Sequence, residues 1–199
     1  MDKQGLRSHL RALRRSMTPD DRAAASAAVC RSALALPELH GARAVHVYLS
    51  LPDEVATADI ISALMDKGVH VVVPWMEADA SMSSVRLLAE DVLAISIGPR
   101  GVPAAPIRRV VAADAWDVVL VPVVGVDRGG NRLGNGAGHY DRLLSGRRCP
   151  TVALAFDCQM MRAIPVEDHD VALDVIVTPT QVHRTRPRPE RRASVGIGG

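Results

Sequence analysis

Aromatic residues, cysteines and long hydrophobic runs are all scarce in this chain. Only 3% of its 199 residues are aromatic, which excludes a single-strand nucleic-acid binder built on stacked rings, because such a site needs several exposed rings. The three cysteines form no C-x-x-C pair, so the sequence suggests neither a disulfide framework nor a zinc site. No apolar run approaches the roughly 20 residues of a membrane span, and the charged N-terminus lacks the apolar stretch of a signal peptide. We therefore expect a cytoplasmic protein.

Charge is unevenly distributed along the chain. The net charge is +2, but residues 184–199 hold five arginines against one acid, and residues 1–16 hold five basic residues against one acid. The segment between them therefore carries an excess of acids. Residues 184–199 are rich in Arg, Pro and Gly and show no apolar period, which predicts a disordered tail. The rest of the chain, residues 1–183, has the length of one domain.

The order of apolar segments predicts an α/β fold. Helices are expected at residues 2–16, about 19–36 and 57–67, and around 140–144. Apolar runs predict strands at residues 44–49, 69–73, 85–88, 92–95, 117–124, 152–156 and 171–177. Thr18 and Thr57 stand where N-caps are expected. A strand, a helix and a strand in succession are typical of a right-handed βαβ unit. We predict a three-layer domain, with an open, mostly parallel sheet and helices on both faces.

A glycine-rich segment follows the most apolar strand and carries the chemistry. Residues 125–138 form this connection, in which Gly134, Gly136 and Gly138 free the backbone to present N–H groups in a concave array. Arg132 and Arg142 add positive charge, and a helix begins directly afterwards. Because open parallel sheets bind ligands beyond the carboxyl ends of their strands, this loop is expected to cradle phosphates. The alternative is a long turn whose glycines only serve the backbone.

Two common phosphate motifs are absent from this loop. The dinucleotide fingerprint needs glycine where His139 stands, and no Gly-Lys-Ser/Thr tripeptide of a P-loop occurs.

Asp141 follows the loop, and a carboxylate beside a triphosphate needs a cation such as Mg²⁺ between them. Asp141 is therefore a candidate metal ligand, with Asp174 as a second. Alternatively, Asp141 only favours the start of a helix and Asp174 only ends a strand.

Residues 131–141 resemble a known family pattern. They reproduce N-R-L-G-x-G-x-G-x-Y-D, the pattern of the 5-formyltetrahydrofolate cyclo-ligase family, also called methenyltetrahydrofolate synthetases, with every fixed position present. Lys3 and Arg7 match a K-x-x-x-R pattern near the N-terminus of the family. Residues 50–57 and 164–178 are similar to two further family segments. The resemblance covers about residues 3–178, although only the glycine loop is highly specific.

This resemblance implies a ligase of one-carbon metabolism. Family members use ATP and Mg²⁺ to convert 5-formyltetrahydrofolate to 5,10-methenyltetrahydrofolate, releasing ADP and phosphate. The formyl oxygen attacks the γ-phosphate, N10 closes the ring, and phosphate leaves. Positioning and charge neutralisation then suffice for catalysis, without a protein nucleophile.

The resemblance also implies site residues. Arg132 and Asp141 would be catalytic, and Asp141 and Asp174 would hold Mg²⁺. The implied ATP site comprises Lys3, Arg7, Arg132, Leu133, Gly134, Asn135, Gly136, Ala137, Gly138, His139 and Tyr140. The implied folate site comprises Leu49, Glu54, Asn135, Gly136, Ala137, Gly138 and His139. Glu54 would accept hydrogen bonds from the paired N–H groups of the pterin.

Departures from the family pattern leave other functions open. Many members have an aromatic residue at the position of His139, and other side chains are common at Asn135 and Ala137. One alternative is therefore a diverged homologue that binds nucleotide or folate without this activity. Another is a nucleic-acid-associated protein that uses its Arg-rich tail, whose binding would be nonspecific. The favoured interpretation is a monomer with ATP and a folate as partners, no specific nucleic acid and no membrane.

Overall fold

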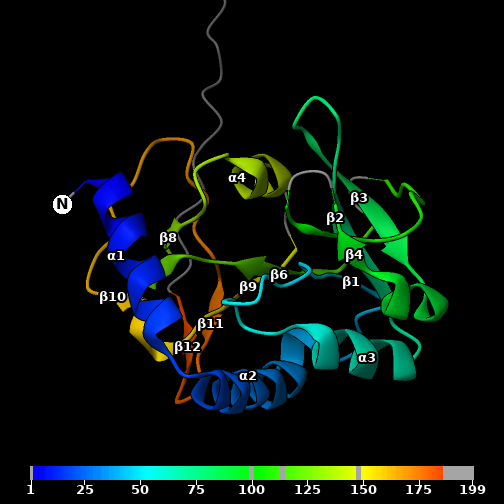
Figure 1. The fold of residues 1–199 in the computed structure, drawn as a ribbon, viewed down its shortest axis with the longest axis horizontal. Coiled ribbons are helices and arrows are strands. Elements are labelled where there is room, and N and C mark those ends of the chain that lie inside the picture. Colours follow the sequence, from blue (N-terminus) through cyan, green and yellow to red (C-terminus); the bar gives the residue numbers. More distant parts are fainter. Residues whose placement is uncertain (1, 99–100, 113–114, 147–148, 186–199) are drawn as a thin grey trace, which may run out of the picture.

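A mostly parallel sheet forms the centre of the molecule. The computed structural model describes residues 2–98, 101–112, 115–146 and 149–185. These residues form a seven-stranded sheet in the order β12–β11–β9–β6–β1–β2–β3 (Figure 1). Its strands are β1 Ala44–His46, β2 His70–Met76, β3 Met82–Leu87, β6 Val118–Pro122, β9 Thr151–Leu154, β11 Val175–Val177 and β12 Val182–Arg184. Only the edge strands β3 and β12 run antiparallel to their neighbours.

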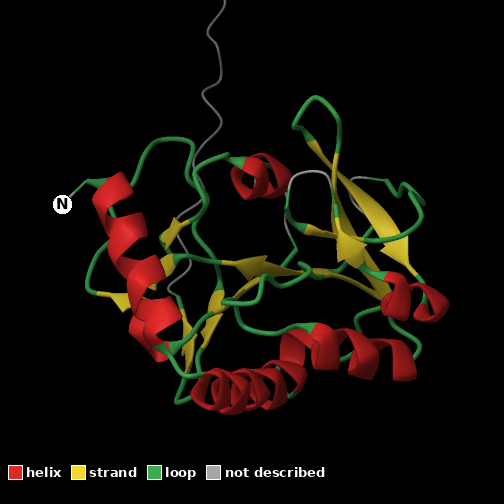
Figure 2. Ribbon diagram, in the orientation of Figure 1, coloured by secondary structure: helices red, strands yellow, loops and turns green. Residues whose placement is uncertain are grey.

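Helices cover both faces of the sheet. They are α1 Lys3–Ser16, α2 Pro19–Leu34, α3 Ala58–Asp66 and α4 His139–Leu144, with short 3₁₀ helices η1 Pro37–Leu39, η2 Ala89–Ala94 and η3 Asp157–Gln159. In Figure 2, α2 and α3 lie along one face and α4 lies on the other, whereas α1 lies at one end of the molecule. This arrangement confirms the predicted three-layer α/β architecture. Within the described ranges no helix is long and apolar enough to cross a membrane.

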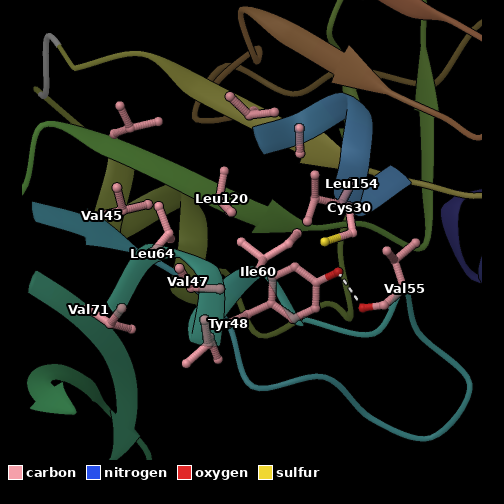
Figure 3. Packing of buried hydrophobic residues seen from close by; sticks show 14 of the residues in the cluster. Cys30, Val45, Val47, Tyr48, Val55, Ile60, Leu64, Val71, Leu120 and Leu154 are labelled. Carbon is pink, nitrogen blue, oxygen red and sulfur yellow. Dashed lines mark hydrogen bonds between the residues drawn. The ribbon is translucent and has the colours of Figure 1, made fainter. Parts of the chain in front are cut away.

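The larger part of the core lies between the sheet and α2 and α3. Branched side chains of β1, β2 and β6 meet Ile60 and Leu64 of α3 there (Figure 3). At the carboxyl end of β1, the hydroxyl of the buried Tyr48 donates a hydrogen bond to the carbonyl of Val55 at 3.0 Å. The segment between these two residues, which includes Leu49 and Glu54, is therefore anchored at both ends to the core.

The glycine-rich connection after β6 contains a short hairpin that the sequence did not predict. Its strands are β7 Gly125–Asp127 and β8 Arg132–Leu133, with β10 Met160–Met161 beside β7. The carboxylate of Asp127 closes the turn, because it accepts hydrogen bonds from the backbone N–H groups of Gly129 and Asn131. It also accepts one from the N–H of Ile164. The hairpin sets the direction in which the following loop, residues 134–138, leaves the sheet.

Three local predictions are wrong. The segment expected as a strand at residues 92–95 lies mostly in η2, and the two-residue strands β4 Ser96–Ile97 and β5 Pro103–Ala104 follow it. Thr57 precedes α3 as expected, but its hydroxyl donates to the carbonyl of Tyr48 at 2.7 Å and does not cap the helix. Arg184, expected in the tail, belongs to β12 and pairs with Glu38. The rest of the expected tail, residues 186–199, lies outside the described residues.

Candidate active site

A cavity opens at the carboxyl ends of β1, β2 and β6. Its volume is about 260 Å³, and its lining includes Leu49 after β1, Met76 of β2 and Pro122 at the end of β6. After β1 the chain adds β2 on one side of β1, and the later strands β6, β9 and β11 lie on the other side of β1. The strand order therefore reverses between β1 and β6, and ligands of open α/β sheets bind at such a point.

This cavity gathers nearly every residue that the sequence predicted. The predicted residues that line it are Lys3, Arg7, Leu49, Glu54, Arg132, Leu133, Gly134, Asn135, Gly136, Ala137, Gly138, His139, Tyr140 and Asp141. They come from α1, from the segment after β1, and from the β8–α4 connection. Residues far apart in the chain thus meet at one place.

Asp174 is the exception, and its predicted pairing with Asp141 is wrong. The Asp174 carboxylate accepts hydrogen bonds from the backbone N–H and the hydroxyl of Thr151, at 2.9 and 2.7 Å. Asp174 immediately precedes β11 and Thr151 begins β9, so both lie at the amino ends of parallel strands. The cavity lies at the opposite, carboxyl edge. The sequence analysis missed this because it placed Asp174 inside a strand at residues 171–177, whereas β11 begins only at Val175.

A buried ion pair lies beside the glycine loop. Arg132 on β8 is only 6% exposed, and it donates to a carboxylate oxygen of Asp141 and to the carbonyl of Val171, each at 2.6 Å. Burial lowers the pKa of Arg132, and the charge of Asp141 acts against this. The guanidinium is therefore held in one orientation by two partners, and Asp141 is fixed at the start of α4.

Two arginines hold the glycine loop in shape. Arg7 on α1 donates to the carbonyl of Gly134 at 2.9 Å, and Arg142 on α4 donates to the carbonyl of Ala137 at 2.9 Å. Gly136 has a φ of +102°, a backbone conformation that side chains other than hydrogen disfavour. The loop carbonyls are thus engaged by cations, and glycine is required at its centre.

Lys3 pairs with two acids that the sequence analysis did not single out. Its ammonium lies 2.9 Å from a carboxylate oxygen of Glu167 and 2.8 Å from one of Asp170. Partial burial opposes the charged form, but the hydrogen bonds to Asp170 and Glu167 outweigh it and raise the pKa of Lys3. Asp170 lies in residues 164–178, a segment similar to the family, and this similarity was the sequence signal that could have identified it. These two acids therefore join the lining of the cavity.

The residues that β2, β3 and the segment after β1 contribute to the cavity are largely apolar but include one carboxylate. Leu49, Met76 and Met82 form this apolar wall, and Met76 and Met82 are cross-strand neighbours on β2 and β3. Glu54 is only 8% exposed and accepts a hydrogen bond from the N–H of Leu51 at 3.0 Å. Burial raises the pKa of Glu54. No sequence signal marked the two methionines, because only the strand register brings them together.

The carboxylates that line the cavity do not gather closely enough to enclose a metal ion by themselves. Across the described part of the chain, no group of three His, Cys, Asp or Glu side chains lies close enough to hold one. Mg²⁺, however, is commonly bound by one or two carboxylates together with substrate phosphates and water. Asp141 suits that arrangement, since it is fixed beside the loop and its side chain remains 22% exposed.

Comparisons with known proteins show the family to which the chain belongs. Residues 1–179 match the sequence model of the 5-formyltetrahydrofolate cyclo-ligase family. The chain is 29% identical to 5-formyltetrahydrofolate cyclo-ligase of Mus musculus over 191 residues, covering 88% of this chain and 92% of that protein. It is also 29% identical to the protein of that name from Escherichia coli K12 over 178 residues, covering 87% and 98%. The NMR structure of Aquifex aeolicus 5,10-methenyltetrahydrofolate synthetase superposes with a TM-score of 0.82 at 26% identity, covering all of both chains. This chain is thus a member of the 5-formyltetrahydrofolate cyclo-ligase family.

Proposed function

We propose that this enzyme converts 5-formyltetrahydrofolate to 5,10-methenyltetrahydrofolate, using ATP and releasing ADP and phosphate. The observation that carries the proposal is the division of one cavity into two environments. The glycine loop and the cations around it form one side, and an apolar wall with the buried carboxylate of Glu54 forms the other. A triphosphate needs the first environment and a pterin ring the second.

The triphosphate would bind on the side of the glycine loop. Lys3, Arg7 and Arg132 supply three cations, and the backbone of residues 134–138 supplies N–H groups. Arg132 is already fixed by Asp141 and Val171, so little reorganisation is needed when charge builds up on the phosphates. Lys3 would exchange its carboxylate partners for phosphate oxygens.

Asp141 would supply the protein ligand to Mg²⁺. One of its oxygens is bonded to Arg132, and a carboxylate has lone pairs enough to bind a cation as well. When bound, Mg²⁺ would neutralise charge on the phosphates of ATP. The remaining ligands would be phosphate oxygens and water.

The folate would lie against the apolar wall. Glu54 would accept the paired N–H groups of the pterin, an arrangement that suits a carboxylate with two acceptor oxygens. Leu49, Met76 and Met82 would cover the faces of its rings and exclude water. The flexible methionines can adapt to an irregular ligand outline.

The reaction then requires two bond exchanges between bound substrates. The formyl oxygen attacks the γ-phosphorus, and the bond from that phosphorus to ADP breaks. N10 attacks the formyl carbon and loses its proton, and the bond from this carbon to the phosphorylated oxygen breaks, releasing phosphate. The protein holds the reacting atoms in line and supplies fixed positive charge, so the reaction does not require a nucleophile from the protein.

We further propose that the enzyme acts as a cytoplasmic monomer. The described residues of one chain bring the proposed ATP and folate residues together in one cavity. The cysteines of the described residues are free thiols, as a reducing compartment would keep them.

A spectroscopic assay tests the proposed function. The purified protein is mixed with 5-formyltetrahydrofolate, ATP and Mg²⁺, and the near-ultraviolet absorption band of the methenyl product is followed. We expect the band to grow only when both ATP and Mg²⁺ are present. A folded protein that binds ATP but forms no product would contradict the proposal and favour a diverged homologue, for which the unusual Asn135, Ala137 and His139 would then be the first residues to exchange.

A further inference from the structure

One stripe of α1 carries four basic residues, and the first two of them line the cavity. Lys3, Arg7, Arg11 and Arg14 follow each other at intervals of four, four and three residues, which places them on one stripe of a helix. Their partners lie on different segments: Lys3 contacts Glu167 and Asp170, Arg7 and Arg11 contact the glycine loop, and Arg14 contacts Asp53. The helix that lines the expected triphosphate side therefore also reaches the segment that carries Glu54.

Arg14 is the buried member of this stripe. It is 3% exposed, and its Nη2 and Nε donate to one carboxylate oxygen of Asp53 at 2.9 and 3.2 Å. Its Nη1 lies 3.8 Å from a carboxylate oxygen of Glu54. That Nη1 atom is buried and has no hydrogen-bond partner among the described residues. The guanidinium is thus held by Asp53, and its third nitrogen, Nη1, points toward Glu54.

We infer that Arg14 is a positioning residue of the folate site, which holds the 51–54 segment in place and keeps Glu54 ionised so that it can accept the pterin. The inference rests on the proposed function, in which Glu54 contacts the substrate. Arg14 itself does not line the cavity, so it would act only through Glu54. Its exchange should therefore affect folate binding and leave the reacting groups in place.

The surroundings of Glu54 explain why a buried cation is needed there. Burial favours the neutral carboxyl group, and the negative charge of Asp53 acts in the same direction. The N–H of Leu51 and the charges of Arg14 and Arg11 favour the carboxylate. Tyr48 and Tyr140 face Glu54 as neutral groups, since burial raises their pKa further above the physiological range. Among the groups that face Glu54, Arg14 is the buried cation.

Arg15 provides a matched control on the same helix. It lies 3.7 Å from the same oxygen of Asp53, but its side chain is 71% exposed. Replacing Arg15 removes one positive charge near Asp53 without changing the buried contact to Glu54. Arg14→Met keeps an unbranched apolar stem but removes the guanidinium and its charge, and Arg14→Lys retains a positive charge without the forked geometry.

The test measures the pKa of Glu54 and the kinetics of the same variants. The Glu54 carboxyl carbon is titrated by ¹³C NMR in the wild type, Arg14→Met, Arg14→Lys and Arg15→Met. We expect Arg14→Met to raise the pKa of Glu54 by about one pH unit or more, whereas Arg15→Met leaves it unchanged and Arg14→Lys returns it toward the wild-type value. We also expect Arg14→Met to raise the KM for 5-formyltetrahydrofolate about tenfold or more, with a larger effect at lower pH. The KM for ATP should change less than about twofold, since the loop contacts of Arg7 and Arg11 remain.

Two results would overturn this role of Arg14. The first is an unchanged pKa of Glu54 in both Arg14 variants, and the second is an equal effect of Arg15→Met. A wild-type enzyme that forms no methenyl product would instead refute the proposed function, while the titration still decides whether Arg14 keeps Glu54 ionised. If Arg14→Met does not fold, the role of Arg14 is tested with Arg14→Lys alone. In that variant the KM for 5-formyltetrahydrofolate must rise while the pKa of Glu54 stays near its wild-type value.

Discussion

Replacing Asp141 by Asn should separate the catalytic role of this carboxylate from its structural role. Asn keeps the size of the side chain and an oxygen that accepts from Arg132, but it removes the charge. Breaking a buried ion pair outright costs about 3–5 kcal/mol. Because Asp141 is partly exposed and Asn retains the hydrogen bond, we expect a loss of only about 1–2 kcal/mol in the free energy of unfolding. That loss corresponds to about 2–8 °C in melting temperature for a domain of this size.

The effect on catalysis should be much larger than the effect on stability. Asp141 is the proposed ligand of the Mg²⁺ that would neutralise charge on the phosphates, so loss of its carboxylate should lower kcat by about 100- to 1000-fold, and the Mg²⁺ concentration for half-maximal rate should rise. Steady-state rates over a Mg²⁺ titration, with thermal unfolding of the same samples, provide the measurement. Asp174→Asn is the matched control, since Asp174 lies at the other edge of the sheet, where it bonds Thr151. Wild-type kcat and Mg²⁺ dependence in Asp141→Asn, or an equal loss in Asp174→Asn, would refute this reasoning.

Two further predictions concern Glu54 and the glycine loop. The pKa of Glu54 is raised in the folded protein, so its contribution to stability is present at pH below its ordinary pKa and is lost as pH rises through the raised pKa. Thermal unfolding should therefore show Glu54→Gln to be more stable than the wild type at pH 7, by a margin that shrinks toward pH 4.5. The KM of this variant for the folate should rise. Equal melting temperatures at both pH values would contradict the buried-charge interpretation. Gly136→Ala should cost about 1–2 kcal/mol in urea unfolding because of its left-handed backbone, whereas Gly134→Ala, which has open space around it, should cost nothing. Similar losses in both variants would mean that the loop backbone is not responsible.

Local sequence signals predicted the parts of the fold that local interactions determine. Thr18 caps α2 as expected, accepting from the N–H of Asp21, and β6, the strand with the most apolar sequence, lies in the middle of the sheet. By contrast, β12 contains the polar residues His183 and Arg184, and it forms because it pairs with β11. Its formation depends on pairing with a strand that only the fold brings close. The hairpin β7–β8 was missed for a similar reason, since its turn is closed by the side chain of Asp127 and not by an apolar pattern.

The candidate site was predicted where residue types and spacing are specific. The glycine loop with Arg132 and Asp141 could be recognised from the sequence, because its chemistry is contained in one short segment. The partners of Lys3 could not, since Glu167 and Asp170 are more than 160 residues away and approach only through the packing of α1. The sequence does not distinguish Arg14 from Arg15, and only the burial of Arg14 against Asp53 sets the two apart.

The central claim is that the formyl oxygen is activated by direct transfer of the γ-phosphoryl group, and an isotope experiment tests it most directly. 5-Formyltetrahydrofolate labelled with ¹⁸O in the formyl group is converted by the enzyme with unlabelled ATP, and the released phosphate is examined by mass spectrometry. The account predicts one ¹⁸O atom in the phosphate for each methenyl product formed, because this oxygen leaves the folate bonded to phosphorus. Methenyl product accompanied by unlabelled phosphate would contradict the account, since ATP would then be hydrolysed without forming a bond to the substrate.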